Sequence, residues 1–259
     1  MKHVLNKPLS YIIANGKEEL DKELQEKFIN GIHKIIKGTP IQYITNEQEF
    51  MKIKFYVDEN VLIPQPDTEI MVEQIIKDYK KNENKTEIKI LDLCTGSGAI
   101  GISLAKFIGK SAILATDISS KALQIAKLNA EKNLCHKKMR FILSNMFDSI
   151  NNERFDVIVS NPPYIKTDII KNLDESVQNE PFIALDGGID GLKFYKIIAE
   201  NAHKFLNEDG KLYLEIGYDQ KEEVISLLEK TLFYKEITCI QDLAGNNRVI
   251  IAKKKSNLL

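Results

Sequence analysis

The sequence predicts a doubly wound α/β fold, in which helices cover both faces of a mainly parallel β-sheet. From residue 88 onward, short apolar runs alternate with longer amphipathic stretches, as expected of strands that are separated by helices. The apolar runs are nearly continuous, which is typical of parallel strands buried on both faces. The length of 259 residues suits one such domain with a small appendage.

The N-terminal part predicts an appendage made of a helix and a hairpin. Apolar residues recur at three- and four-residue steps over 17–37, which predicts an amphipathic helix that a Gly-Thr-Pro stretch at 38–40 ends. Residues 41–63 look extended, and alternating apolar residues there predict a short hairpin. We therefore predict a reduced N-terminal segment at 1–60 and a main domain at 61–259.

The main domain is predicted to begin with a helix and to continue as repeated strand, loop and helix. Pro64-Gln65-Pro66 is a rigid turn, and Asp67 or Thr68 can cap a helix that runs to about residue 81. A polar loop follows over 80–87. The predicted strands are 88–93, 112–116, 140–143, 155–160 and 211–216, with a C-terminal antiparallel hairpin at 234–241 and 248–252. The predicted helices are 99–107, 120–133, 192–206 and 220–230.

Composition and charge limit the functional classes. The formal net charge is -1, whereas a protein that works on nucleic acid usually carries a basic surplus. Cys94, Cys135 and Cys239 are far apart without metal-ligand spacing, and the histidines form no cluster with acidic residues. The sequence shows no signal peptide and no apolar stretch long enough for a membrane span. These features predict a cytoplasmic protein without a metal site.

A glycine-rich loop follows the strand predicted at 88–93. The run Cys94-Thr95-Gly96-Ser97-Gly98 leads into a helix that contains Gly101. Glycines let the backbone approach a ligand closely, and the helix N-terminus offers unpaired N–H groups. Asp117, at the end of the next predicted strand, could accept hydrogen bonds from both ribose hydroxyls of a nucleoside. Because the three glycines also match the dinucleotide fingerprint, this loop alone leaves a nicotinamide cofactor and S-adenosylmethionine both open.

A second loop, Asn161-Pro162-Pro163-Tyr164, follows the strand predicted at 155–160. Ligands bind beyond the carboxyl ends of strands in open α/β sheets, so the two loops are expected to share a crevice. The Asn161 side-chain oxygen and the Pro162 carbonyl could accept the two N–H groups of an amide or exocyclic amino nitrogen. The prolines hold these acceptors rigidly, and Tyr164 offers a flat apolar face. Asn161, Pro162 and Tyr164 are the predicted catalytic residues, and Pro163 joins them in the substrate site.

The chemistry expected of this second loop is methyl transfer to a planar nitrogen. An amide nitrogen is a poor nucleophile because its lone pair is delocalised, and two acceptors on its hydrogens stabilise the positive charge that develops. The sulfonium of S-adenosylmethionine already provides a good leaving group. The remaining task is in-line positioning, worth up to roughly 7 to 11 kcal/mol in favourable systems. We predict no general base.

Several segments resemble the release-factor glutamine methyltransferase family, enzymes that methylate the side-chain amide of glutamine in the Gly-Gly-Gln motif of peptide chain release factors. The resemblance covers about residues 38–252. Besides the two loops it includes Gly38-Thr39-Pro40-Ile41-Gln42-Tyr43-Ile44, Leu62-Ile63-Pro64-Gln65-Pro66-Asp67-Thr68-Glu69, Glu180-Pro181, Ala184-Leu185-Asp186-Gly187-Gly188, Leu214-Glu215-Ile216-Gly217 and Asp242-Leu243-Ala244-Gly245. Several amino-methylating families share the Asn-Pro-Pro-Tyr loop, whereas the Leu62 and Ala184 segments are far more particular.

The resemblance implies a seven-stranded class I methyltransferase fold of Rossmann-like topology, with a peptide chain release factor as its partner. By position, residues 94–98 would hold the methionine end of S-adenosylmethionine, Asp117 its ribose, and Met146 would flank the adenine. Asn161 would touch both cofactor and substrate, and residues 161–164 would clasp the glutamine amide. The sequence departs from the family pattern at four positions and in the length of the segment before Gly38, which is much shorter. The four positions are Gln65, Cys94, Asn145 and Met146.

The residues alone leave three other functions open. A nucleic-acid amino-methyltransferase, acting on adenine N6 or guanine N2, would use the same clasp on a flipped base, but the charge balance speaks against a basic binding face. A non-catalytic cofactor-binding partner subunit is disfavoured by the intact clasp. A nicotinamide dehydrogenase would need a histidine or lysine acid–base group beside the glycine loop. Glu215, at the end of a predicted strand, could approach the crevice or serve a structural pair.

Overall fold

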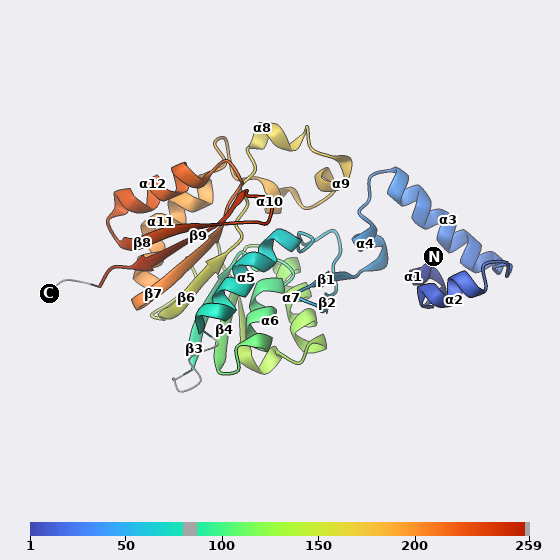
Figure 1. The fold of residues 1–259 in the computed structure, drawn as a ribbon, viewed down its shortest axis with the longest axis horizontal. Coiled ribbons are helices and arrows are strands. Elements are labelled where there is room, and N and C mark those ends of the chain that lie inside the picture. Colours follow the sequence, from blue (N-terminus) through green and yellow to red (C-terminus); the bar gives the residue numbers. More distant parts are fainter. Residues whose placement is uncertain (80–86, 257–259) are drawn as a thin grey trace.

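The computed structural model describes residues 1–79 and 87–256, and its main feature is a seven-stranded sheet with helices on both faces (Figure 1). The strand order is β5-β4-β3-β6-β7-β9-β8; β9 runs antiparallel to both neighbours, and the other pairs are parallel. After β3 the chain adds β4 and β5 on one side of that strand, and then crosses to add β6 and β7 on its other side. The carboxyl end of β3 is therefore the topological switch point of the sheet. The strands are β3 (Ile88–Leu93), β4 (Ser111–Asp117), β5 (Met139–Leu143), β6 (Phe155–Ser160), β7 (Leu206–Glu215), β8 (Tyr234–Gln241) and β9 (Asn247–Lys254). The predicted fold class is confirmed.

Two apolar clusters cover the two faces of the sheet. Successive side chains of a strand point to opposite faces, so Ile90 and Val157 enter one cluster while Leu91 and Ile158 enter the other. Burial of each such aliphatic side chain stabilises the fold by roughly 1.5–3 kcal/mol, which holds the strand ends in place. The first face is covered by α5 (Pro66–Tyr79), α6 (Ala99–Phe107) and α7 (Ser120–Lys132), and the second by α11 (Lys193–Phe205) and α12 (Lys221–Thr231) (Figure 1).

The N-terminal helices stand away from the sheet (Figure 1). The amphipathic helix predicted over 17–37 is confirmed in its main part, which begins after Asp21 because that side chain accepts from the Leu24 amide at 2.9 Å. Two short helices before it were not predicted, since neither is long enough for a periodic signal. The N-terminal helices are α1 (Lys2–Leu5), α2 (Leu9–Ala14), α3 (Lys22–Ile36) and α4 (Ile41–Thr45).

The prediction of an extended segment at 41–45 is wrong, because these residues form α4. Asn46 ends the helix in the left-handed conformation, with φ 53°. The Tyr43 hydroxyl donates to the Val61 carbonyl at 2.6 Å, and Asn46 Nδ2 donates to the Val57 carbonyl at 3.0 Å. This helix is therefore stabilised by contacts with a segment further along the chain, which local periodicity does not reveal.

The predicted N-terminal hairpin is confirmed as β1 (Gln48–Phe50) and β2 (Ile53–Phe55), which pair antiparallel. Met51 and Lys52 both take positive φ at its turn, at 52° and 60°, as a tight two-residue hairpin requires. The backbone amide of Met51 donates to Glu69 Oε1 at 2.6 Å, which ties the hairpin to α5. That helix begins at Pro66 and is described to Tyr79; the polar loop predicted from residue 80 lies mostly outside the described residues.

Two further segments refine the prediction. The C-terminal hairpin is confirmed, and its second strand, β9, lies between β7 and β8 in the sheet. Between β6 and α11 the chain forms short helices that the sequence did not predict, at the end of the sheet where the parallel strands finish (Figure 1). They are α8 (Thr167–Ile170), α9 (Glu175–Gln178) and α10 (Phe182–Leu185), and a 3-10 turn, η1 (His136–Lys138), precedes β5.

Gly101→Ala is expected to destabilise the fold. A Cβ at Gly101 would lie 2.9 Å from Asp92 Oδ2, 3.0 Å from Met139 Cε and 3.2 Å from Ile113 Cγ2. Overpacking of this kind outweighs the helix propensity of alanine, so the free energy of unfolding should fall by about 1 to 2 kcal/mol, as urea unfolding would measure. Gly109→Ala is the control, because a Cβ there meets nothing within 4 Å. Equal unfolding midpoints for the two variants would contradict this account of the α6 packing.

Candidate active site

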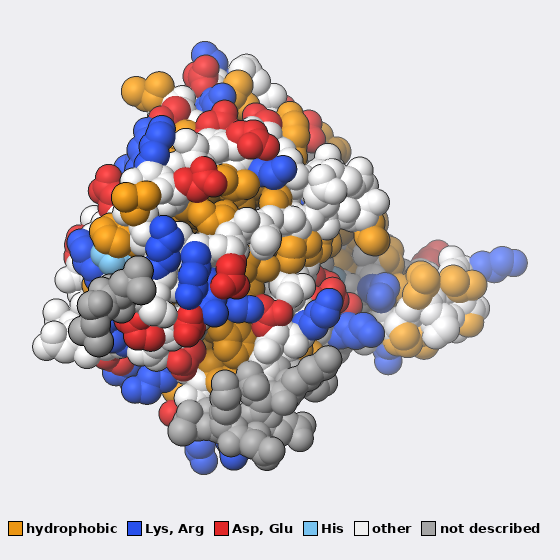
Figure 2. Space-filling view, turned by 60° about the vertical axis from the view of Figure 1, so that its left-hand side comes forward, with side chains coloured by type: hydrophobic (Ala, Val, Ile, Leu, Met, Phe, Trp, Pro, Cys, Tyr) orange, Lys and Arg blue, Asp and Glu red, His pale blue; other side chains and the backbone are white. Residues whose placement is uncertain are grey.

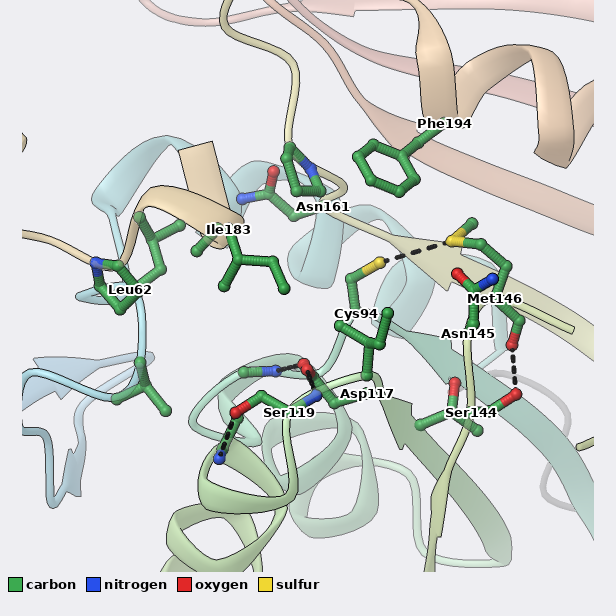
Figure 3. A pocket seen from close by; sticks show the side chains of 18 of the residues that line it. Leu62, Cys94, Asp117, Ser119, Ser144, Asn145, Met146, Asn161, Ile183 and Phe194 are labelled. Atoms are coloured by element: carbon green, nitrogen blue, oxygen red, sulfur yellow. Dashed lines mark hydrogen bonds between the residues drawn. The ribbon is translucent and has the colours of Figure 1, made fainter. Parts of the chain in front are cut away.

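A cavity of about 390 Å³ lies beyond the carboxyl ends of β3, β4 and β6 (Figure 3). Both predicted loops contribute to it, the glycine loop through Cys94 and Gly96 and the second loop through Asn161 and Pro163. The remaining wall comes from Leu62 ahead of α5, Ile183 in α10 and Phe194 in α11. The cavity therefore occupies the switch point of the sheet, where doubly wound folds bind their ligands.

The glycine loop is held open toward the cavity by its own hydrogen bonds. Thr95 Oγ1 donates to Asp92 Oδ2 at 2.6 Å, and the Gly101 amide donates to the same oxygen at 3.0 Å. Gly96 has φ 54°, and a Cβ placed on it would meet nothing within 4 Å. Because Gly96 also lines the cavity, this open space is a cradle in which a ligand can approach the backbone closely.

Asp117 joins the glycine loop to the next helix. Its Oδ2 accepts from the Gly96 amide and its Oδ1 from the Ser119 amide, each at 2.9 Å. Burial raises the pKa of Asp117, and these backbone donors oppose that shift. A carboxylate has about four acceptor sites, so Asp117 can still accept from a ligand hydroxyl. This arrangement suits a carboxylate that reads a pair of ribose hydroxyls.

A sulfur-rich wall faces the Asp117 side of the cavity. Cys94 Sγ lies 3.9 Å from Met146 Sδ, and both residues take positive φ, at 58° and 50° (Figure 3). The Ser144 hydroxyl donates to the Met146 carbonyl at 2.8 Å and fixes that turn. Burial raises the pKa of the Cys94 thiol to about 12, so it stays neutral. The wall is apolar and uncharged, which suits a planar base more than a phosphate.

The Asn-Pro-Pro-Tyr loop is fixed at both ends. Before it, the Ser160 hydroxyl donates to the Leu93 carbonyl at 2.9 Å, which locks β6 to β3. After it, the Tyr164 carbonyl accepts from Gln220 Nε2 at 3.0 Å. Asn161 Nδ2 donates to Thr68 Oγ1 at 3.2 Å, which links the loop to α5. The loop therefore needs little reorganisation to hold a planar group.

The structure brings some predicted site residues together at the cavity and places others behind them. Those that line it are Cys94, Gly96, Asp117, Met146, Asn161 and Pro163. Those outside the lining are Thr95, Ser97, Gly98, Pro162 and Tyr164. Thr95 and Ser97 are buried and support the glycine loop, and the Ser97 carbonyl accepts from Asn129 Nδ2 at 2.9 Å. Tyr164 packs against the second apolar cluster, where burial raises the pKa of its phenol.

Leu62, Ile183 and Phe194 also line the cavity. The family-like segments 62–69 and 180–188, which contain the first two, are expected from the sequence to flank the mouth of the crevice, whereas Phe194 was not predicted. Contacts far apart in sequence bring these segments together. Glu180 Oε2 accepts from the Ile63 amide at 2.8 Å, across 117 residues of chain.

Residues 1–79 and 87–256 hold neither a cluster of metal-ligand side chains nor a helix suited to span a membrane. No group of three or more His, Cys, Asp or Glu side chains is placed to hold a metal ion there. None of the helices in that part of the chain has the length and apolar character required to cross a bilayer.

Known proteins are similar to this chain in sequence over nearly its whole length. Residues 66–242 match the family model of the methyltransferase small domain, and residues 1–45 match that of the PrmC N-terminal domain. The release factor glutamine methyltransferase of Clostridium botulinum is 40% identical over 254 residues, covering 97% of this chain and 88% of the relative. The protein of the same name from Lactococcus lactis is 41% identical over 253 residues, covering 97% and 90%.

Solved structures of low identity share the fold alone. A methyltransferase from Pyrococcus furiosus matches with a TM-score of 0.57 at 20% identity, covering 88% of this chain and 99% of that one. The hMettl16 catalytic domain matches with a TM-score of 0.62 at 14% identity, covering 79% and 77%. These likenesses confirm the class I methyltransferase fold, and the close relatives confirm the resemblance found in the motifs. The chain belongs to the release factor glutamine methyltransferase family.

Proposed function

We propose that this enzyme transfers a methyl group from S-adenosylmethionine to the side-chain amide nitrogen of glutamine in the Gly-Gly-Gln motif of peptide chain release factors. One observation carries the proposal: a single cavity holds the Gly96–Asp117 pair on one side and the Asn161 amide on the other. Release-factor methylation belongs to translation termination, which places the enzyme in the cytoplasm.

S-adenosylmethionine fits the residues on the glycine-loop side. The cradle at Gly96 accommodates the methionine end, and the flanking residues of the 94–98 loop hold its shape. Asp117 would accept from the ribose hydroxyls, and the apolar wall that includes Met146 would flank the adenine. When bound, S-adenosylmethionine supplies an electrophilic methyl on a sulfonium. Asn145 Nδ2 donates to Asp148, so this asparagine is held at the cavity edge without adding charge.

The second loop acts on the acceptor amide. Asn161 Oδ1 and the Pro162 carbonyl accept the two N–H groups and so stabilise the positive charge that develops on nitrogen. Pro163 and Tyr164 keep these acceptors fixed, which limits reorganisation on the way to the transition state. The nitrogen proton is lost to solvent after transfer, because the methylated amide cation is strongly acidic. No group of the enzyme is needed as a general base.

The acceptor is a protein rather than a nucleic acid. Close relatives named as release factor glutamine methyltransferases support this assignment, and the net charge of -1 provides no basic surplus for phosphate contacts. The test incubates the enzyme with methyl-labelled S-adenosylmethionine and one of three acceptors: a release factor, the same factor with its Gly-Gly-Gln glutamine replaced, and mixed DNA or RNA. Label should enter the first only. Label in nucleic acid, with none in the unmodified factor, would favour the base methyltransferase instead.

The N-terminal segment is proposed to add affinity for the release factor, with the domain boundary near residue 60. Deleting residues 1–37 should raise KM for the full release factor more than it lowers kcat, which is the pattern of lost uniform binding. A short peptide that carries Gly-Gly-Gln is the control acceptor, since it should not reach the N-terminal helices. Its kcat/KM should be the same for both enzymes. A deletion that lowers kcat alone would place these residues in the chemical step instead.

A further inference from the structure

The clasp works only if the Asn161 amide presents its oxygen, and not its NH₂ group, to the acceptor nitrogen. Oxygen accepts the substrate N–H, whereas an NH₂ group in the same place would face another donor. The two ends of an asparagine amide are similar in size, so packing alone selects neither rotation. The site therefore needs a hydrogen-bond partner that distinguishes them.

Thr68 provides one half of that selection. Asn161 Nδ2 donates to Thr68 Oγ1 at 3.2 Å, and Thr68 is only 5% exposed, in the first turn of α5. With its NH₂ group held on α5, Asn161 leaves Oδ1 without a hydrogen bond from any residue that the structure describes. Figure 3 shows the Asn161 amide at the edge of the cavity, above Cys94 and Ile183.

Glu215 provides the other half. A hydroxyl can donate as well as accept, so Thr68 alone would tolerate either rotation of Asn161. Glu215 ends β7 and is 2% exposed; burial raises its pKa to about 7, and the neighbouring Thr68 and Asn161 side chains oppose that shift. When the Thr68 hydroxyl donates its hydrogen bond to the Glu215 carboxylate, its oxygen can only accept from Asn161. Glu215 Oε2 has no hydrogen-bond partner in the described part of the chain, so this oxygen is free to accept from the Thr68 hydroxyl.

Neighbouring contacts hold both supporting residues. Arg248 pairs with Asp67 at 2.9 Å and so fixes the start of α5 next to Thr68. The Tyr195 hydroxyl donates to the Glu215 carbonyl at 2.8 Å and fixes the end of β7. Thr68 and Glu215 thus approach Asn161 from two separate elements that are each anchored.

We propose that Thr68, with Glu215 behind it, is a positioning pair that holds the Asn161 amide with its oxygen toward the acceptor nitrogen. The inference rests on the proposed function and adds two residues that do not line the cavity themselves. They orient the Asn161 amide because its NH₂ group is bonded to Thr68, which leaves the amide oxygen for the acceptor nitrogen.

The first test compares Thr68→Val with Thr68→Ser. Valine keeps the shape and removes the hydroxyl, so kcat at saturating release factor and S-adenosylmethionine should fall about 10- to 100-fold, the scale for a misplaced catalytic group. KM for the release factor, Kd for S-adenosylmethionine and Tm should stay close to those of the parent. Serine keeps the hydroxyl and should keep kcat. A parental kcat in Thr68→Val, or an equal loss in Thr68→Ser, would overturn the proposal.

A double-mutant cycle then asks whether Thr68 acts through Asn161. Once Asn161 is alanine, Thr68→Val should lower kcat no further, because no amide remains to be positioned. Additive losses would show that Thr68 acts independently and would refute the pair. A parent enzyme that methylates no release factor would instead refute the proposed function, so the two failures give different results.

Discussion

Asn161→Ala is expected to lower kcat by about 10²- to 10³-fold, the scale for removing one preorganised electrostatic partner of a transition state. The amide oxygen stabilises charge that develops only as the methyl group arrives, so the loss should fall on kcat. Steady-state kinetics with a purified release factor would measure it. Kd for S-adenosylmethionine should change much less, because the glycine loop and Asp117 are untouched.

Asn145→Ala is the matched control for that experiment. Asn145 is also an asparagine that lines the cavity, but it lies beside Met146 on the other side from the Asn161 clasp (Figure 3). Its loss should affect S-adenosylmethionine binding more than kcat at saturation. If Asn161→Ala turned over at a near-parental rate, Asn161 would not be the amide clasp.

Asp117→Ala should weaken S-adenosylmethionine binding by about 1 to 3 kcal/mol, the scale for losing hydrogen bonds to a buried polar group. The carboxylate is expected to hold the ribose, and it also accepts from the Gly96 and Ser119 amides. Isothermal titration calorimetry would give the change in Kd. Asp117→Asn is the companion variant: it keeps one acceptor oxygen and the size of the side chain, so its loss should be smaller.

The same titration also tests the identity of the cofactor. The glycine spacing fits a nicotinamide dinucleotide as well, but the cavity wall at Cys94 and Met146 is apolar and suits a base better than a pyrophosphate. Tight binding of NAD to the parent protein, without affinity for S-adenosylmethionine, would refute the cofactor assignment.

The sheet could be predicted because the local sequence of each strand is sufficient to identify it. Ile88–Leu93 and Phe155–Ser160 are apolar runs of strand length between turns, and such runs are buried whatever surrounds them. The segment at 41–45 was predicted wrongly because its helix depends on Tyr43 and Asn46 binding distant carbonyls. The short helices after β6 were missed because each spans only about one turn, which is too short for a periodic signal.

The candidate site likewise contains residues that local motifs identify and residues that only the fold brings together. The cavity-facing backbone of Gly96 and the Asn161 clasp follow from local motifs at strand ends, so sequence reasoning could name them. Thr95 and Ser97 belong to the same motif, yet the structure turns them into the protein, which spacing does not reveal. Thr68 is 93 residues from Asn161, and only the folded sheet brings their side chains together.

The most direct test is mass spectrometry of a release factor after incubation with this enzyme and S-adenosylmethionine. The account predicts the mass of one added methyl group on the peptide that contains the Gly-Gly-Gln glutamine, located on that side chain by fragmentation. The modification should be absent when Asn161→Ala replaces the parent enzyme over the same short incubation. An unmodified glutamine after prolonged incubation, with S-adenosylmethionine shown to bind, would contradict the assignment of the release factor as substrate.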